Sequence, residues 1–313
     1  MKKKMTVVIP AYNEELMVSR AAAEVRETLD EAGIPYELIF IDDGSRDRTW
    51  AMIRETSSQD PNVRGLCFSR NFGKETAIFA GLSAASGECT AVMDCDLQHP
   101  PQVLPVMYRL WEDGYQIVEG VKKQRSKEAP MYRKMTGFFY KIMSASTGAD
   151  LDGASDFKLL DREVVRVILS MPERSMFFRA TTSWVGFKTI KTEYNVQERE
   201  AGESKWTTTA LFRYALNNIA AFSTVPLQIV TFMGVACFIC SLVLMIYSLF
   251  QYFFGRAVEG YTTLLIVLLF IGSAIMVSLG IIGYFIGKIY DEVRQRPRYI
   301  ISETTGFPEE HEA

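Results

Sequence analysis

Two long runs without a charged residue constrain most strongly what this chain of 313 residues can fold into. They cover residues 225–254 and 261–287, and residues 255–260 join them. A helix needs roughly 20 apolar residues to cross a bilayer. Buried helices of soluble proteins rarely extend this far without a charge, so we predict a two-helix transmembrane hairpin over residues 225–288.

The charges around these runs predict their orientation. The connection between them contains Arg256 and Glu259, whereas a cluster of basic residues follows the second run: Lys288, Arg294, Arg296 and Arg298. Because cytoplasmic flanks are enriched in Lys and Arg, we expect both chain ends in the cytoplasm. No signal-peptide pattern precedes the first strand-like segment. The sequence therefore predicts a protein of the cell membrane with two spans.

The first 120 residues alternate between strand-like and helix-like patterns. Strands are predicted at residues 6–9, 37–41, 63–68, 89–93 and 116–121. Helices are predicted from a cap at Asn13 to about Gly33, around Trp50, and over residues 74–85 and 103–111. Residues 157–160 and 187–196 add two strands, with a helix at 162–169. This order predicts an α/β fold with a mostly parallel sheet and helices on both faces.

Three oxygen-bearing side chains follow the apolar residues 91–93, where a buried strand should end. They are Asp94, Asp96 and Gln98. In an extended chain, alternate residues point the same way, and carboxylate and amide oxygens suit Mg²⁺ or Mn²⁺. Such a pair of carboxylates also occurs in solvated turns, so the motif alone leaves both interpretations open. His99 follows, and we expect a structural role for it.

Polar residues also follow the first two predicted strands. Tyr12 could stack on a base, and Glu14 or Asp42 could accept hydrogen bonds from a base or ribose. Because parallel strands end at one edge of the sheet, these residues should line one cleft with Asp94. The chain has neither a Gly-x-Gly-x-x-Gly fingerprint nor a Walker loop, which disfavours a dehydrogenase or a kinase. The pattern favours a pocket for a nucleotide diphosphate.

Five segments in order carry a resemblance to a known family: residues 8–15, 41–45, 69–75, 94–101 and 199–205. The chain resembles family 2 glycosyltransferases that act on polyprenyl phosphates, which include dolichol-phosphate mannosyltransferases and bactoprenol-phosphate glucosyltransferases. The resemblance implies a Rossmann-like GT-A fold and a metal-dependent hexosyltransferase. It implies Mg²⁺ or Mn²⁺ on Asp94, Asp96 and Gln98. It also implies that the nucleotide is contacted by Pro10, Tyr12, Glu14, Asp42 and Asp94.

The patterns along the sequence, together with the resemblance, divide the chain into four segments. Residues 1–200 would form the cytoplasmic GT-A catalytic domain, and residues 201–224 a juxtamembrane loop with an amphipathic helix at the interface. The hairpin at 225–288 and a cytoplasmic tail at 289–313 would follow.

The implied reaction is an inverting transfer of a sugar from a nucleotide-diphosphate sugar to undecaprenyl phosphate at the cytoplasmic membrane face. A UDP-sugar such as UDP-glucose is the expected donor, although glucose, N-acetylglucosamine and mannose donors share the same diphosphate. A phosphate monoester has a second pKa near ~6, so it is largely ionised and needs cations more than a base. The expected catalytic residues are Asp96, Asp156, Arg199 and Lys205. The acceptor phosphate would be held by Arg125, Arg133, Arg199, Ser204 and Lys205.

Two alternatives stay open. A processive polysaccharide synthase also combines a GT-A domain with membrane spans, but it usually carries a Gln-x-x-Arg-Trp motif, which this chain lacks. A catalytically inactive membrane scaffold is disfavoured by the intact Asp94, Asp96 and Gln98. Asp156 could assist the acceptor or simply stabilise a turn. Small residues in the second apolar run permit close helix packing, so we expect a homo-oligomer, with a tetramer suggested by the resemblance, and no nucleic-acid partner.

Overall fold

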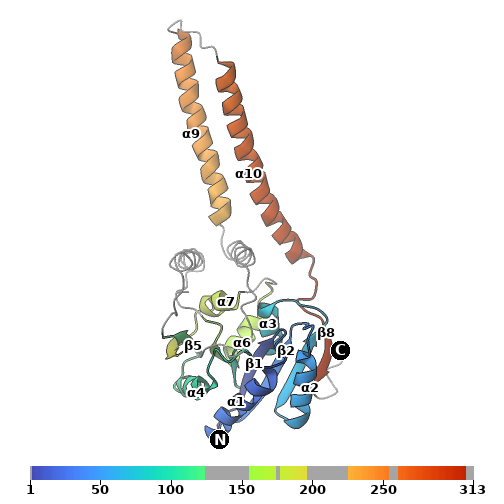
Figure 1. Cartoon of the computed structure of the whole chain (residues 1–313). Helices are drawn as coiled ribbons and strands as arrows, with labels where there is room; N and C mark the ends of the chain where they lie inside the picture. Colours follow the sequence, from blue (N-terminus) through green and yellow to red (C-terminus); the bar gives the residue numbers. More distant parts are fainter. Residues whose placement is uncertain (1, 124–154, 174–176, 196–224, 254–259, 308–313) are drawn as a thin grey trace. The chain divides into compact units, whose positions relative to one another are not determined.

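The computed structural model describes residues 2–123, 155–173, 177–195, 225–253 and 260–307. The chain forms two compact units (Figure 1). One comprises Met1–Thr207 together with Arg296–Ala313, and the other comprises Thr208–Gln295. The first contains a mixed β-sheet with helices, and the second contains two long helices.

Within the described residues, the sheet of the first unit has eight strands in the order β7-β5-β6-β4-β1-β2-β3-β8. Neighbouring strands are parallel in β4-β1-β2-β3 and in β5-β7, whereas β6 and β8 are antiparallel to their neighbours. The strands are β1 Met5–Ala11, β2 Tyr36–Asp42, β3 Val63–Phe68, β4 Cys89–Val92, β5 Ile117–Lys122, β6 Lys158–Asp161, β7 Thr189–Tyr194 and β8 Ile301–Thr305.

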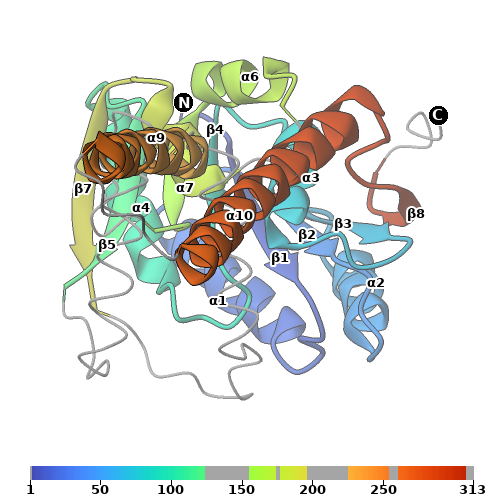
Figure 2. The same ribbon diagram turned by 90° about the horizontal axis from the view of Figure 1, so that it is seen from above.

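Helices cover both faces of this sheet, and α1 and α2 lie opposite α3 and α6 (Figure 2). The two-residue period of a strand explains the division, because Val7 and Ile9 enter one core and Val8 enters the other. The helices that the structure describes in this unit are α1 Val18–Glu31, α2 Thr49–Gln59, α3 Lys74–Ala84, α4 Leu104–Glu112, α6 Arg162–Ser170 and α7 Phe178–Trp184, with a 3-10 turn at Pro101–Val103.

The predicted α/β fold is confirmed, and each predicted strand and helix of this unit that lies in the described residues is present, with shifted bounds. Three expectations about local structure were wrong or incomplete. Asn13 does not cap a helix, because α1 begins at Val18 and Asn13 has a positive φ of 53°. Helix α7 was not predicted. Strand β8 was not predicted either, and it lies within the residues that were expected to form a tail.

Strand β8 is held to the sheet by more than its ladder with β3. The backbone N–H of Ser69 donates to the carbonyl of Ile300 at 2.9 Å, and the Ser302 hydroxyl donates to the carbonyl of Cys67 at 3.1 Å. The Tyr299 ring stacks on Phe68, with centroids 5.1 Å apart and an interplanar angle of 18°. The segment that follows the last long helix is therefore an integral part of the first unit.

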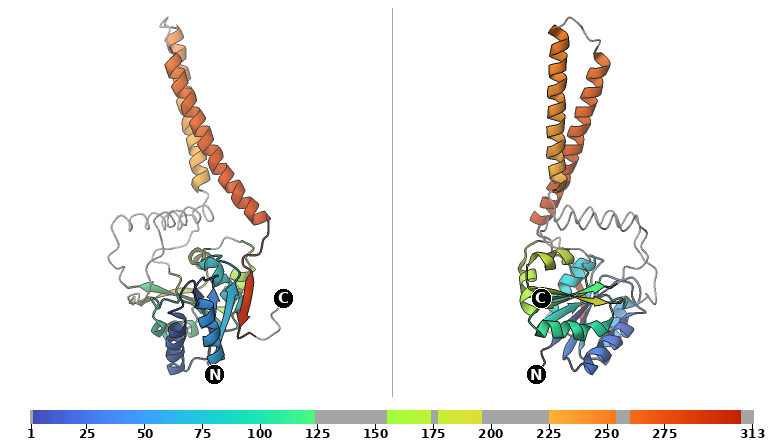
Figure 3. Two further views of the ribbon diagram at one scale, coloured as in Figure 1. Left: turned by 45° about the vertical axis from the view of Figure 1, so that its right-hand side comes forward. Right: turned by 90° about the vertical axis from the view of Figure 1, so that its left-hand side faces the viewer.

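The described part of the second unit contains α9 Val225–Phe253 and α10 Tyr261–Val293, which contact each other and run side by side (Figure 3). Among the described residues, the stretch Phe270–Val293 is long and apolar enough to cross a membrane, and none of it is buried. Helix α9 contains a shorter apolar stretch at Val230–Leu244. The predicted juxtamembrane segment, 201–224, lies outside the described residues. Two spans, and the division into four segments, stay predictions.

Candidate functional site

The loops after β1 and β2 are bonded to one another at the carboxyl edge of the sheet. The backbone N–H of Asp43 donates to the carbonyl of Ala11 at 2.9 Å. The N–H of Asn13 donates to the Ser45 hydroxyl, and the amide oxygen of Asn13 accepts from the N–H of Arg46, both at 2.8 Å. The left-handed backbone of Asn13 thus turns the first loop onto the second.

Asp43 joins a third loop, residues 70–73, to this edge. Its buried carboxylate accepts from the backbone N–H of Phe72 at 2.6 Å and of Gly73 at 2.9 Å. Burial raises the pKa of Asp43 to about 6, against the lowering effect of these two donors. The next residue, Gly44, has a φ of +66°, and a Cβ there would lie 2.4 Å from the carbonyl carbon of Arg70. Only glycine allows this close approach.

The predicted nucleotide contacts lie along this edge with different exposures. Asp42 is 1% exposed, and its carboxylate accepts from the Ser45 N–H at 3.0 Å and from the Cys67 thiol at 3.5 Å. Burial raises the pKa of Asp42 despite these donors. Three others, at and just after the end of β1, are partly exposed: Pro10, Tyr12 and Glu14. The fifth, Asp94, follows β4 and is also partly exposed.

The predicted metal ligands after β4 alternate in burial as expected. Asp94, Asp96 and Gln98 are partly exposed, whereas Cys95 and Leu97 between them are buried. The chain is not extended here, so that premise was wrong: residues 95–99 form turns and bends, and Leu97 has a φ of 57°. The Gln98 N–H donates to an Asp96 carboxylate oxygen at 3.1 Å, as in an Asx turn.

Glu14 and the β4 turn are electrostatically linked. Burial, followed by the carboxylates of Glu14, Asp96 and Asp94, raises the pKa of the Cys95 thiol well above its usual range. The loop after β1 and the turn after β4 therefore bring their acidic residues near the same buried cysteine. The expected cleft at the ends of β1, β2 and β4 is consistent with this arrangement.

His99 has a structural contact. Its Nδ1 accepts from the backbone N–H of Asp94 at 3.1 Å, and its ring stacks on Phe157 with centroids 4.9 Å apart. Tyr194 packs edge-on against both rings. Burial lowers the pKa of His99, so the neutral ring that can accept this bond is favoured.

A cluster of four charges lies beside the β4 turn. Lys74, the first residue of α3, bonds Asp94 at 2.6 Å and Asp156 at 2.9 Å through its Nζ. Arg179 of α7 donates to both oxygens of Asp156, at 2.7 Å from Nε and 2.8 Å from a terminal nitrogen. Burial opposes the charged form of Lys74, but the carboxylates of Asp156 and Asp94 outweigh it and raise the lysine pKa.

The two carboxylates of this cluster are held ionised. Burial acts against ionisation of Asp156, yet Lys74 and Arg179 hold its pKa well below the usual range. Burial also opposes ionisation of Asp94, and the Lys74 ammonium group lowers its pKa. An ionised Asp156 between two cations is a poor proton donor and a weak base.

Arg179 and Glu75 were missed by the sequence analysis. A carboxylate oxygen of Glu75 accepts from the backbone N–H of Phe178 at 2.8 Å, which fixes the start of α7 beside α3. Burial and the Asp156 charge raise the pKa of Glu75 to about 7. The signal for Glu75 was its place at the end of segment 69–75, which carries the family resemblance. Residues 171–186 gave no pattern that placed Arg179.

The donor set at the β4 turn fits a hard divalent cation. The Asp94 carboxylate is partly exposed and already pairs with a cation, the ammonium group of Lys74, at 2.6 Å. Within the described ranges, no group of three or more His, Cys, Asp or Glu side chains is arranged to hold a metal. Mg²⁺, however, is usually held by one or two carboxylates together with substrate phosphates. Asp94, Asp96 and the Gln98 amide match that requirement, so these residues fit the implied cation.

The remaining predicted site residues lie outside the described residues. They are Arg125, Arg133, Arg199, Ser204 and Lys205. Their roles toward an acceptor phosphate, like the roles of all predicted site residues, stay predictions.

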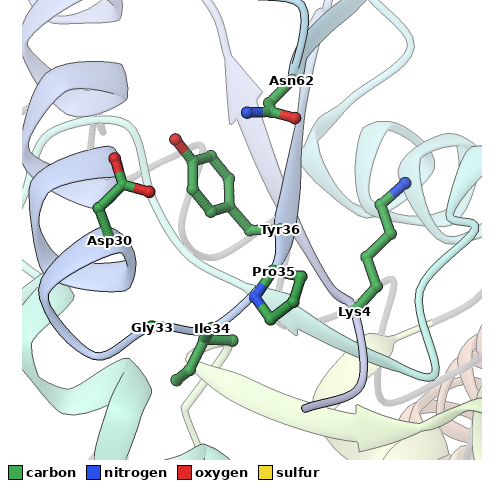
Figure 4. A pocket seen from close by; sticks show the side chains of 7 residues that line it. All are labelled: Lys4, Asp30, Gly33, Ile34, Pro35, Tyr36 and Asn62. Carbon is green, nitrogen blue, oxygen red and sulfur yellow. The ribbon is translucent and has the colours of Figure 1, made fainter. Parts of the chain in front are cut away.

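A pocket lies at the opposite edge of the sheet, near the starts of β1 and β2 (Figure 4). It is lined by Lys4, Asp30, Gly33, Ile34, Pro35, Tyr36 and Asn62. The pocket therefore lies at the amino ends of the parallel strands, whereas ligands of parallel sheets bind at their carboxyl ends. It is separate from the candidate site.

The chain is similar to known proteins over most of its length. The sequence model of glycosyl transferase family 2 matches residues 6–169. The bactoprenol glucosyl transferase of Shigella phage SfII is 39% identical over 306 residues, which cover 96% of this chain and 98% of the phage protein. The prophage bactoprenol glucosyl transferase homolog of Escherichia coli (strain K12) is 38% identical over 95% of this chain and 98% of its own. An uncharacterized glycosyltransferase of Bacillus subtilis (strain 168) is 35% identical, with coverages of 96% and 94%.

A solved structure is also similar. Glucosyl-3-phosphoglycerate synthase from Mycobacterium tuberculosis, in complex with Mn²⁺, UDP and glucosyl-3-phosphoglycerate, matches 70% of this chain and 78% of its own. The TM-score is 0.47 and the sequence identity is 19%.

Proposed function

This chain belongs to glycosyl transferase family 2, and we propose that it transfers one sugar from a nucleotide-diphosphate sugar to the phosphate of a polyprenyl phosphate. One observation carries the proposal. The family model covers only residues 6–169, but the similarity to bactoprenol glucosyl transferases covers 96% of the chain and so includes the long apolar helices. A lipid acceptor would explain why the similarity extends beyond the catalytic sheet to the apolar helices, because an enzyme that acts on a lipid works at a membrane.

The donor is a UDP-sugar, and UDP-glucose is the first candidate. The glucosyl transferases named among the relatives support the sugar. The base would bind beside Tyr12 and the loop after β2, and the diphosphate would lie at the β4 turn. The Asn13, Asp43 and Gly44 contacts support this assignment, because they hold the loops in one arrangement before substrate arrives.

The chemistry requires a good leaving group and a correctly held nucleophile. A Mg²⁺ or Mn²⁺ bound to Asp94, Asp96 and Gln98 would stabilise the charge of the departing diphosphate as a Lewis acid. The acceptor phosphate is already ionised, so a general base is not required. The ion pairs of Asp156 support a role in holding cations instead. Arg125, Arg133, Arg199, Ser204 and Lys205 would hold the acceptor phosphate.

The reaction would take place at the cytoplasmic face of the cell membrane. The apolar stretch Phe270–Val293 supports membrane association. In this proposal α9 and α10 both cross the bilayer, residues 201–224 lie at its surface, and both chain ends are cytoplasmic. The protein would act as a homo-oligomer, with a tetramer as the first expectation.

The proposal is tested with the purified full chain in detergent. Radiolabelled UDP-glucose, UDP-N-acetylglucosamine and GDP-mannose are each incubated with undecaprenyl phosphate, with Mg²⁺, with Mn²⁺ or with EDTA. We expect label in the lipid fraction with UDP-glucose and none with EDTA. Asp96→Asn should lower the rate by about 100-fold or more. Asp113→Asn, an exposed residue at the end of α4, should leave it unchanged. Equal transfer by the Asp96 variant would refute the metal role, and no lipid product with any donor would refute the function.

A further inference from the structure

The two carboxylates next to Lys74 are held unequally. Both oxygens of Asp156 accept hydrogen bonds from Arg179, and one of them also accepts a hydrogen bond from the Lys74 ammonium group. Asp94, by contrast, pairs with Lys74 at 2.6 Å, and in the described part of the chain this is its one ion pair with a lysine or arginine. Asp156 would keep a strong partner if Lys74 moved, whereas Asp94 would not.

The side chains of Lys74 and Asp94 are more exposed than that of Asp156. Lys74 is the first residue of α3, its side chain is 39% exposed, and that of Asp94 is 30% exposed. Asp156 is only 6% exposed and is fixed by the planar fork of Arg179. A lysine ammonium on a flexible stem can keep its bond to the fixed carboxylate while it leaves the more exposed one.

A divalent cation on Asp94 would compete with this ammonium. Both are positive, and metal–oxygen bonds at about 2.0–2.2 Å are shorter than the observed ion pair. Two cations this close to one carboxylate repel each other strongly in a partly buried site. Occupation of Asp94 by one cation therefore disfavours the other.

We propose that Lys74 is a positioning residue that pairs with Asp94 in the enzyme without substrate. When the donor binds, the metal would replace the Lys74 ammonium group as the cation bound to Asp94. The inference rests on the proposed metal site. Lys74 keeps Asp94 ionised and correctly placed in the empty enzyme, and it weakens binding of metal alone. The metal would then bind tightly only together with the nucleotide diphosphate, whose phosphates supply further ligands. Lys74 would remain bonded to Asp156, beside the site where the donor diphosphate and the acceptor phosphate are proposed to bind.

The test measures Mn²⁺ binding to the full chain in detergent, from the electron paramagnetic resonance signal of free Mn²⁺, without nucleotide and with UDP. Lys74→Met should bind Mn²⁺ alone about 10-fold more tightly than the unaltered protein. Lys74→Arg keeps the cation and should stay within about 3-fold of it. Arg179→Met is the matched control, because it removes one positive charge that bonds Asp156. Its gain in affinity should be clearly smaller.

Two further variants make the result specific. Adding Asp94→Asn to Lys74→Met should abolish the gain, because the gain depends on the freed carboxylate. Lys74→Gln should show a gain in the same direction, and it replaces Lys74→Met if thermal melting shows that the methionine variant does not fold.

The outcomes separate the two proposals. If the unaltered protein binds Mn²⁺ with UDP but Lys74→Met and Lys74→Gln bind Mn²⁺ alone no more tightly, the role of Lys74 is wrong and the metal site stands. If Arg179→Met gained as much Mn²⁺ affinity as Lys74→Met, the loss of any nearby positive charge would explain the gain. That result would also overturn the specific role of Lys74. If no Mn²⁺ binds even with UDP, the metal site and the role of Lys74 both fail.

Discussion

The close approach of the loops after β2 and β3 makes a sharp prediction for Gly44→Ala. The Cβ of an alanine would lie 2.4 Å from the carbonyl carbon of Arg70 and 2.7 Å from the backbone nitrogen of Asn71. Both are backbone atoms, so no side-chain rotation relieves the clash. The loops would have to separate, and the loop after β2 is expected to bind the nucleotide.

Gly33 provides a matched control for the backbone strain. Its φ of +61° is close to the +66° of Gly44, but a Cβ there would meet nothing within 4 Å. Gly33→Ala therefore carries only the left-handed penalty, about 1–2 kcal/mol. Gly44→Ala adds overpacking of about 1–3 kcal/mol, for a total loss of roughly 2–5 kcal/mol.

Thermal melting in detergent, together with UDP titration, measures both effects. A loss of 1 kcal/mol lowers the Tm of a domain of this size by about 3 °C, so Gly44→Ala should melt roughly 3–9 °C below Gly33→Ala. It should also lose UDP affinity, which Gly33→Ala should keep, because Gly33 lies at the opposite edge of the sheet. Equal melting temperatures for the two variants would show that the loops do not approach as described.

Three further changes test other contacts of the first unit. The pKa of Asp43 is raised to about 6 from 3.8, so the folded state binds its proton more tightly than the unfolded state. Its contribution to stability is therefore largest at low pH and declines as the pH rises from about 4 to 6, by at most about 3 kcal/mol. Asp43→Asn should lack this decline in denaturation experiments across that range, and parallel pH profiles would contradict the assignment. Lys158→Met should lose about 3–5 kcal/mol in unfolding free energy, because it leaves the charge of Glu119, which is 4% exposed, without its lysine partner. Adding Glu119→Gln should recover most of this loss, and no recovery would argue against an unpaired buried charge. Tyr299→Ala should remove the stacking on Phe68, about 1 kcal/mol, and speed hydrogen exchange in β8 before β1; unchanged exchange in β8 would exclude this anchor.

The sheet was predictable because the strands before residue 123 are short and mostly apolar, as buried parallel strands are. Strand β8 has no such pattern. Its residues Ile301–Thr305 are mostly polar, and four of the five are exposed. It forms a strand because it pairs with the side of β3 that faces away from β2, and because Tyr299 and Ser302 contact β3 residues. Those causes are tertiary, and a local pattern does not contain them.

Helix α7 illustrates the same limit. It is only seven residues long and contains two adjacent threonines, which are weak helix formers. Its first N–H is held by Glu75, which lies 103 residues earlier in the chain. No periodicity in residues 178–184 encodes that contact.

The candidate site was predictable where topology alone determines it. Asp42 ends β2 and Asp94 lies shortly after β4. Both strands pair in parallel with β1, so the strand order brings the two residues to the same end of the sheet. The ion pairs were not predictable, because Lys74, Asp156 and Arg179 come from elements whose packing the sequence pattern does not specify. The extended geometry expected of residues 94–98 was wrong because Leu97 enters the left-handed region and buries its side chain.

The most direct test of the account is the mass of the lipid product. Undecaprenyl phosphate is incubated with UDP-glucose and the purified chain, and the lipid fraction is analysed by mass spectrometry. We expect one new species, heavier than the acceptor by one hexosyl unit, which mild acid returns to the lipid phosphate. A ladder of species with several sugars, or sugar released only as a polymer, would contradict single transfer to a polyprenyl phosphate.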